Sequence, residues 1–195
     1  MNTITKSVLT HATPTIPRSK QRGISLVIVL MFLVILSVLG ISIIQGSSFG
    51  ARIARNEADR NLSFQAAEAA LRDAEADIKY IKADGLPCVD GIAPCRAEAI
   101  GGSSFYADCP GGLCETNAAS PVWETSSRWT SAGASIPYGT YTGAAALPLV
   151  SQQPRYLIEI FKLGFEQVIV YRITAVGYGA SASTKTMLQT SVKAR

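Results

Sequence analysis

Histidine is almost absent from this chain, because the only one, His11, lies in the segment that precedes Ile24. Without that segment, the chain cannot form a Ser-His-Asp triad, a catalytic Cys-His pair or a His-ligated zinc site. Acidic residues are numerous from Glu57 onward, but none forms a recognisable catalytic motif. Those of the helical stretch, including Asp73 and Asp77, are expected on solvated helix faces. We therefore expect neither an enzyme nor a cofactor.

Acidic residues are missing from the chain before Glu57. The excess of positive charge, +4 in total, lies in one terminal segment. Residues 1–23 contain Lys6, Arg18, Lys20 and Arg22 and no acid, whereas residues 24–195 contain 14 basic and 14 acidic side chains. A protein that binds nucleic acid needs a basic surface against the phosphates. The neutral remainder of the chain therefore argues against nucleic acid as its principal ligand.

Charge is also missing from Ile24–Ile44, a run that consists mainly of Leu, Ile, Val and Phe. About 20 apolar residues in a helix span a membrane core of roughly 30 Å. The basic residues just before this run should stay in the cytoplasm, so the remaining chain should be periplasmic, behind a single inner-membrane span. A secretory signal is the alternative, but its apolar region is shorter and Gly46-Ser47-Ser48 matches its cleavage site poorly.

The junction between the basic and apolar segments, Lys20-Gln21-Arg22-Gly23, resembles the class III leader that prepilin peptidase recognises. The resemblance implies cleavage between Gly23 and Ile24, methylation of the new Ile24 amine, and retention of the apolar segment. Major pilins commonly carry Glu as the fifth mature residue. Here that position is Ile28, and no acid precedes Glu57.

Residues 51–82 contain neither Gly nor Pro and are rich in Ala, Glu, Arg and Leu. They predict an amphipathic helix that continues a transmembrane and assembly helix over 24–50. An apolar stripe at spacings of three and four should face a partner surface, for which a coiled-coil dimer is the alternative to the chain's own sheet. The stripe consists of Phe64, Ala67, Leu71, Ala74, Ile78 and Ile81.

Residues 20–75 resemble the N-terminal region of PilX-type minor pilins, above all in the run DRNLSFQAAEAALR at 59–72. The resemblance implies a subunit that primes type IV pilus assembly with other minor pilins and the major pilin. It also implies a place at the pilus tip, where the complex presents a PilY-type adhesin. A GspK-like pseudopilin of a type II secretion system and a membrane-anchored periplasmic binding module are the alternatives.

Residues 83–154 contain 9 Gly and 7 Pro, which predicts turns and connections with one or two short elements near Trp123 and Trp129. The four cysteines of the chain lie here, and a periplasmic location permits disulfides. Three pairings are open; we favour Cys88–Cys95 and Cys109–Cys114, because Pro110-Gly111-Gly112 can form a tight turn. A four-cysteine zinc site and a calcium site that includes Asp84 and Asp90 are the alternatives.

The last part of the chain, 155–195, predicts an antiparallel sheet of three to four strands. Its strand-like segments are Arg155–Leu163, Val168–Gly177 and Thr184–Val192, and YRITAVGYGAS at 171–181 resembles the C-terminal strand motif of PilX-type pilins. Such a sheet needs cover on one face. We expect Phe64, Leu71, Ile78 and Ile81 of the helix to provide it, in an α+β, type IV pilin-like fold with a disulfide-stapled loop region.

The leader generates a first prediction. Cleavage after Gly23 should leave a mature chain that extends from Ile24 to Arg195. Mass spectrometry of the mature N-terminus should find a peptide that begins at Ile24, and replacing Gly23 with a bulky residue should leave the chain uncut and locked in the membrane. A mature terminus near Gly50 would instead identify a secretory signal.

Overall fold

The computed structural model describes residues 24–117, 119–130, 133–163 and 168–194; the side chains of 42–48 and 163 lie outside the description. One long helix, α1, extends over Ile24–Ile78. Contacts divide the chain into two compact units, with the boundary between Gly50 and Ala51. Each unit is therefore described by itself, and we call the second unit, Ala51–Arg195, the head.

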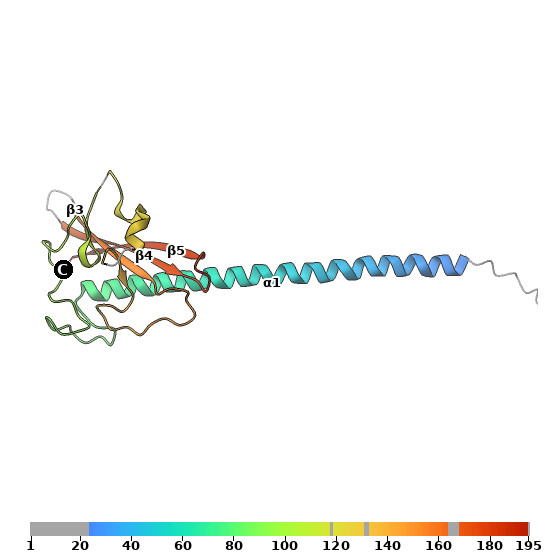
Figure 1. Cartoon of the computed structure of the whole chain (residues 1–195), viewed down its shortest axis with the longest axis horizontal. Helices are drawn as coiled ribbons and strands as arrows, with labels where there is room; N and C mark the ends of the chain where they lie inside the picture. The colour runs from blue at the N-terminus through green and yellow to red at the C-terminus, as the bar shows by residue number, and fades with distance from the viewer. Residues whose placement is uncertain (1–23, 118, 131–132, 164–167, 195) are drawn as a thin grey trace, which may run out of the picture. The chain divides into compact units, whose positions relative to one another are not determined.

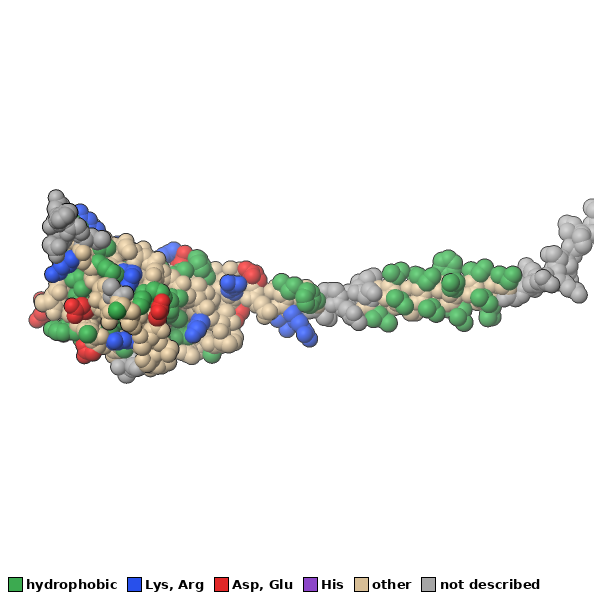
Figure 2. All heavy atoms as spheres, turned by 90° about the horizontal axis from the view of Figure 1, so that it is seen from above, with side chains coloured by type: hydrophobic (Ala, Val, Ile, Leu, Met, Phe, Trp, Pro, Cys, Tyr) green, Lys and Arg blue, Asp and Glu red, His purple; other side chains and the backbone are tan. Residues whose placement is uncertain are grey.

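In the first unit, Ile24–Ile41 is long and apolar enough to cross a membrane; we call it the assembly segment. Its apolar side chains are exposed, and hydrophobic atoms cover the face seen in Figure 2. The hydroxyl of Ser37 donates to the carbonyl of Leu33 at 2.7 Å, so this polar group has a partner within the helix. A helix that is apolar on all sides needs lipid or other apolar helices around it.

Helix α1 ends at Ile78, four residues before the predicted end at Lys82. Tyr80 adopts left-handed backbone dihedrals (φ 57°) and breaks the helical path. The amide of Ile81 then bonds the Ala76 carbonyl and the amide of Tyr80 bonds that of Asp77, which is a Schellman motif. Ile81 consequently lies beyond the helix, where it forms an isolated bridge with Pro87.

The head contains the antiparallel meander that the sequence predicts. Strand β3 (Arg155–Leu163) pairs with β4 (Val168–Tyr178), which pairs in turn with β5 (Lys185–Lys193). Figure 1 shows these strands beside the C-terminal part of α1. This confirms the α+β, pilin-like fold class.

The sheet is nevertheless larger than predicted and is mixed. The short strands β1 (Leu113–Glu115) and β2 (Ile136–Pro137) both pair with β3, β1 in parallel and β2 antiparallel. They make five strands in the described part of the chain. Strands of two or three residues are too short to show an alternating pattern, so the sequence predicted only loops there.

The face of α1 that packs on the sheet consists of small residues. Ala66, Ala67, Ala70 and Ala74 are at most 2% exposed. The large side chains of this layer come from the strands and include Tyr156, Ile158 and Ile173. Small helix residues let the helix axis approach the sheet, and the larger strand side chains then fill the space on either side of it.

The closest approach between α1 and the sheet lies at Gly177 of β4. A Cβ atom at this residue would lie 2.2 Å from both the Ala67 nitrogen and the Ser63 carbonyl oxygen. These are backbone atoms of α1, so no side-chain rotation could relieve the clash. Only glycine at position 177 therefore permits the observed distance between helix and sheet.

The predicted packing stripe is correct in part. Ala67 and Ala74 are fully buried, and Leu71 and Ile78 are partly buried and pack against the core cluster. Phe64 is 43% exposed, and Ile81 is not part of α1. The buried face of the helix is centred on its alanines, so Phe64 lies at the margin of the contact.

Loops cover the opposite face of the sheet. Two short 3-10 helices, Val122–Glu124 and Ser126–Trp129, lie near the two tryptophans, as expected. Val122, Trp129 and the Cys109–Cys114 disulfide pack with Leu157, Val176 and Tyr178 in a second buried cluster. The sheet is therefore covered by the helix on one face and by the cysteine-rich loop region on the other.

The helix-to-sheet contact generates a second prediction. Gly177→Ala should lower the free energy of unfolding of the head by about 1–3 kcal/mol or more, because the new methyl group overlaps backbone atoms of α1. The measurement is urea unfolding of the full-length, disulfide-bonded protein in detergent, followed by tryptophan fluorescence. Gly102→Ala is the control, since its Cβ would meet only the tip of the Ile169 side chain at 3.9 Å. Equal losses in both variants would contradict the close approach.

Candidate functional site

The predicted cleavage site, between Gly23 and Ile24, lies where the described part of the chain begins. Gly23 lies outside the described residues, and Ile24 is the first residue of α1 and 63% exposed. Ile28, one turn further, is 50% exposed, and the first turn of α1 contains no acid. The positive end of the helix dipole therefore has no acidic side chain in the first turn of α1 to neutralise it.

In the head, a buried ion pair fastens the loop region to α1. The Arg96 guanidinium donates two hydrogen bonds of 2.7 Å to the carboxylate of Asp77, and the Tyr156 hydroxyl donates a third of 2.9 Å. Asp77 is 3% exposed and Arg96 8% exposed. The same guanidinium lies 3.9 Å from the centre of the Tyr141 ring. Asp77 thus joins the helix, the loop region and strand β3 at one point.

Electrostatics keep the Arg96 guanidinium charged. Burial lowers the pKa of Arg96, but the hydrogen bonds and charge of Asp77 outweigh burial, so the pKa is raised overall. Burial, reinforced by the nearby carboxylates, also raises the pKa of Tyr156 well above its usual value. The phenol therefore remains a hydrogen-bond donor to Asp77.

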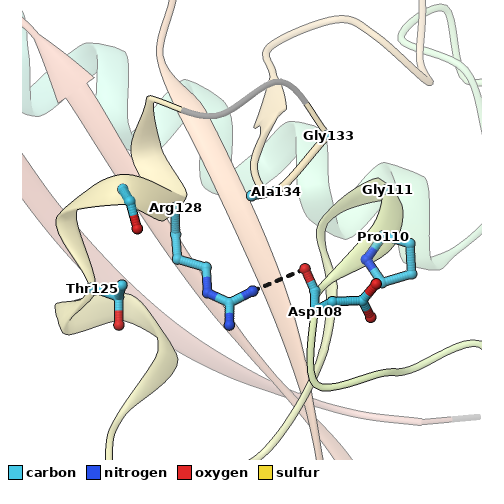
Figure 3. A pocket seen from close by; sticks show the side chains of 8 residues that line it. Asp108, Pro110, Gly111, Thr125, Arg128, Gly133 and Ala134 are labelled. Atoms are coloured by element: carbon cyan, nitrogen blue, oxygen red, sulfur yellow. Dashed lines mark hydrogen bonds between the residues drawn. The ribbon is translucent and has the colours of Figure 1, made fainter.

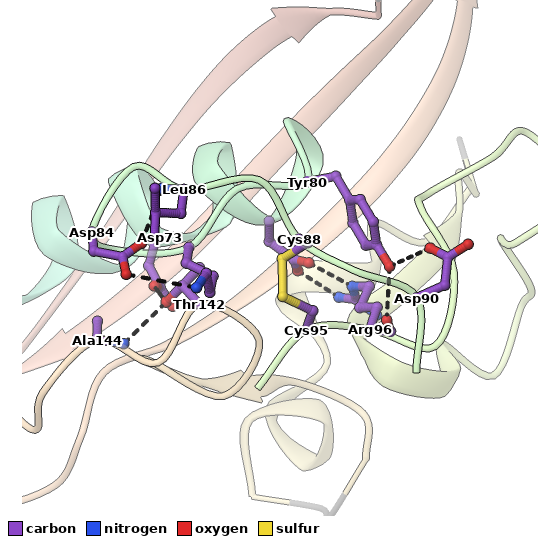
Figure 4. Close-up of a disulfide and its surroundings, with 12 residues drawn as sticks. Asp73, Tyr80, Asp84, Leu86, Cys88, Asp90, Cys95, Arg96, Thr142 and Ala144 are labelled. Carbon is purple, nitrogen blue, oxygen red and sulfur yellow. Dashed lines mark hydrogen bonds and ion pairs between the residues drawn. A yellow bond between two sulfur atoms is a disulfide. The ribbon is translucent and has the colours of Figure 1, made fainter. Parts of the chain in front are cut away.

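The first disulfide positions this ion pair. Cys88 is bonded to Cys95, directly before Arg96, and Figure 4 shows the bridge beside the Arg96 side chain. The Tyr80 hydroxyl lies 2.6 Å from the Asp90 carboxylate and 3.0 Å from the Arg96 carbonyl oxygen. The hydrogen bond to Asp90 is the main reason why the pKa of Tyr80 is raised to about 12. Together these contacts restrict the path of the chain between the helix end and Arg96.

A second buried carboxylate holds another loop. Asp73, 5% exposed, accepts a hydrogen bond of 2.8 Å from the Gly139 amide and one from the Thr142 hydroxyl. Burial raises the pKa of Asp73, although both hydrogen bonds act in the opposite direction. The expectation that Asp73 and Asp77 lie on a solvated face is therefore wrong. Their hydrogen-bond partners lie 19 to 79 residues away in the sequence. The spacing of residues along the helix therefore could not predict these contacts.

A third carboxylate of α1, Asp59, holds the turn between β4 and β5. It accepts hydrogen bonds of 2.6 and 3.2 Å from the amides of Ala180 and Ser181. A hydrogen bond from Thr184 is the main cause of its lowered pKa, with the two amides also contributing. Asp59 opens the run that carries the family resemblance, and its structural role explains why an acid suits this position.

The candidate metal ligands have other partners. All four cysteines are in disulfides, and these are the pairs that the sequence analysis favoured. Asp84 accepts the Leu86 amide hydrogen and pairs with Lys82 at 3.7 Å, while Asp90 bonds Tyr80. The part of the chain that the structure describes contains no group of three His, Cys, Asp or Glu side chains placed to hold a metal.

A polar hollow of about 580 Å³ is lined by Asp108, Pro110 and Arg128, among other residues (Figure 3). Its central side chain, Arg128, donates hydrogen bonds of 2.9 Å to the carbonyl oxygens of Asp108 and Ala107. These bonds tie the 3-10 helix of the tryptophan loop to the segment before Cys109.

The buried ion pair generates a third prediction. Arg96→Ala should lower the free energy of unfolding by about 3–5 kcal/mol, because it leaves the Asp77 carboxylate buried without its charged partner. Arg72→Ala is the control: Arg72 pairs with Glu68 at 3.6 Å on the surface, and its loss should cost about 0–1 kcal/mol. Urea unfolding monitored by tryptophan fluorescence measures both. Similar small losses would show that Arg96 is not what fastens the loop region.

Comparison with known families identifies both ends of the described chain. Residues 22–72 match the PilX N-terminal family, and residues 110–194 match the C-terminal family of the type IV pilus assembly protein PilX. No curated protein and no solved structure matches the chain. The two family matches cover most of the chain, and each includes structural features described above: Asp59 and three of the four buried alanines in the first, the five-stranded sheet in the second. The chain is a member of the PilX family of type IV pilus assembly proteins.

Proposed function

We propose that this PilX-family protein is a minor pilin that starts the type IV pilus and remains in a complex at its tip. The observation that carries the proposal is the apolar side chain of Ile28 in an assembly segment that has no acid. In major pilins, the acid expected at this position neutralises the N-terminal amine of a neighbouring subunit. A chain with Ile28 has no charge with which to dock beneath another subunit.

The electrostatics favour the first position in the filament. Pilin assembly segments would pack in a bundle of apolar helices, where an unpaired charge is costly and a paired charge directs docking. The Ile24 amine of this chain can still accept the acid of the next subunit. The chain therefore gains little from a subunit ahead of it and can receive one behind it.

The two units suggest the order in which the protein is processed, held in the membrane and assembled. Prepilin peptidase removes residues 1–23, and the assembly segment holds the mature chain in the inner membrane with its head in the periplasm. The head, which contains two disulfides, suits this oxidising compartment. On assembly the chain joins other minor pilins and the major pilin, and its head helps to present a PilY-type adhesin at the cell surface.

The fourth prediction tests the role of Ile28. Deleting the protein should lower the number of pili per cell more than it changes their diameter, because initiation fails and elongation does not. Ile28→Leu should restore the number fully. Ile28→Glu should also restore it, but should raise the amount of the protein relative to the main subunit in sheared pili, because the added acid permits docking within the shaft.

Electron microscopy and quantitative mass spectrometry of sheared pili are the measurements. Two results would refute the proposal: an unchanged number of pili after deletion, or a wild-type protein as abundant as the main subunit. An Ile28→Glu protein that stays at the wild-type ratio would refute the docking argument alone.

A further inference from the structure

Two large apolar side chains flank the same strand from opposite faces of the sheet. Phe64 of α1 is 43% exposed and lies beside β5 on the helix-covered face. Met187 of β5 is 42% exposed and belongs to the opposite face, near Trp129 and Tyr178. Both side chains remain accessible although the core of the head lies next to them.

The strand between them, β5, is an edge of the sheet. In the described part of the chain it pairs with β4 and with no other strand (Figure 1). Backbone hydrogen bonds join Gly179 to Thr184 and Ala194 to Ile169, at the two ends of this pair. Because bonded and non-bonded pairs alternate along an antiparallel ladder, the amides and carbonyls of Met187, Gln189 and Ser191 point to the free edge.

The middle of this edge carries little protection against pairing. Charges, prolines and bulges on an edge strand hinder the addition of another strand. On β5 the charges, Lys185 and Lys193, lie only at the two ends, and the run TMLQTSV between them contains no charge, no Pro and no Gly. An unguarded edge of this length is therefore a surface that is open to a further strand.

A hollow lies on each side of this edge, and each measures about 480 Å³. One lies between α1 and β5 and is lined by Phe64 and Leu188, with Met187 at the strand edge that borders both hollows. The other lies over the opposite face and is lined by Trp129, Tyr178 and Met187. Side chains of an added strand would point alternately into the two hollows.

We propose that the β5 edge binds an extended segment of another pilus subunit, which adds to the sheet as a further strand. Its backbone would bond the outward groups of Met187, Gln189 and Ser191, and alternate apolar side chains would cover Phe64 and Met187. The occupant should also carry an acid near the start of β5. The adjoining hollow contains Arg60 and Lys185 but only one acid, Glu57, and no ion pair joins these three described side chains.

This inference needs partner subunits, which membership of a pilus assembly family supplies, and it does not depend on a place at the tip. A second copy of this chain is the less favoured occupant. Two β5 edges meeting would bring Lys185 and Lys193 of both copies into one sheet with no added acid. A subunit that carries an acid would meet the positive charge of this edge better.

The experiment is site-specific photocrosslinking of the full-length protein in piliated cells. A benzophenone amino acid replaces Phe64 in one strain and Met187 in another, and Leu149, 81% exposed and outside α1 and the sheet, is the control position. Crosslinked peptides are then mapped by mass spectrometry. Phe64 and Met187 should label one segment of the same partner, while the control should not label it.

The positions of the labels give the sharpest criterion. Successive residues of a strand face opposite sides, so the residue labelled from Phe64 and the residue labelled from Met187 should be an odd number of positions apart. An even separation, two different partner proteins, or no crosslink in assembled pili would overturn the proposal. A crosslink between two copies of this chain would overturn the choice of occupant.

Two variants test the edge itself. Ser191→Pro removes an outward amide without removing a bond to β4, and it should lower both crosslinks about tenfold, whereas Ser191→Ala should not. Phe64→Gln leaves the strand intact and should lower the Met187 crosslink by a similar factor, because the buried apolar contact is lost. Thiol alkylation verifies that both disulfides remain closed in every variant. Undiminished crosslinking in Ser191→Pro and Phe64→Gln would refute strand addition.

Discussion

The contact between α1 and β4 at Gly177 determines how the head is built. The glycine brings strand backbone against helix backbone, and the alanines at 66, 67, 70 and 74 allow the same approach on the helix side. Because the helix contributes so little volume, the large core side chains have to come from β3 and β4. The helix can also approach only one face of the sheet, so the opposite face needs a separate cover.

That cover is formed by loops with little regular structure, together with the second disulfide and Trp129. On the helix side, polar contacts hold the neighbouring segments in place. Carboxylates of α1 act as fixed acceptors: Asp77 for the segment after the first disulfide, Asp73 for the loop at 139–142, and Asp59 for the turn after β4. Such contacts specify position more than they add stability, since burying charged groups is itself unfavourable.

The sequence predicts those parts of the head that depend on residues close together in the chain, such as single strands and tight turns. Alternating β-branched residues located three strands to within a few residues, and a turn between Cys109 and Cys114 favoured the observed pairing. The failures have long-range causes. Tyr80 ends α1 early in a conformation that helix propensity does not anticipate, and Asp73 and Asp77 have partners in distant loops. Of the predicted stripe, the alanines lie at the centre of the contact face and Phe64 lies at its margin. Strands β1 and β2 exist only because β3 offers an edge to them.

Each of the two units contributes one feature to the proposed role. The first unit supplies an apolar helix without an acid, which suits the proposed first position in a filament, while the head has a free strand edge at β5 to which we propose that a partner segment adds. The most direct test is to locate the protein on intact pili by a gold label attached at exposed Leu149. The account predicts label at one end of each fibre. Label distributed along the shafts, at a density comparable to that of the main subunit, would contradict it.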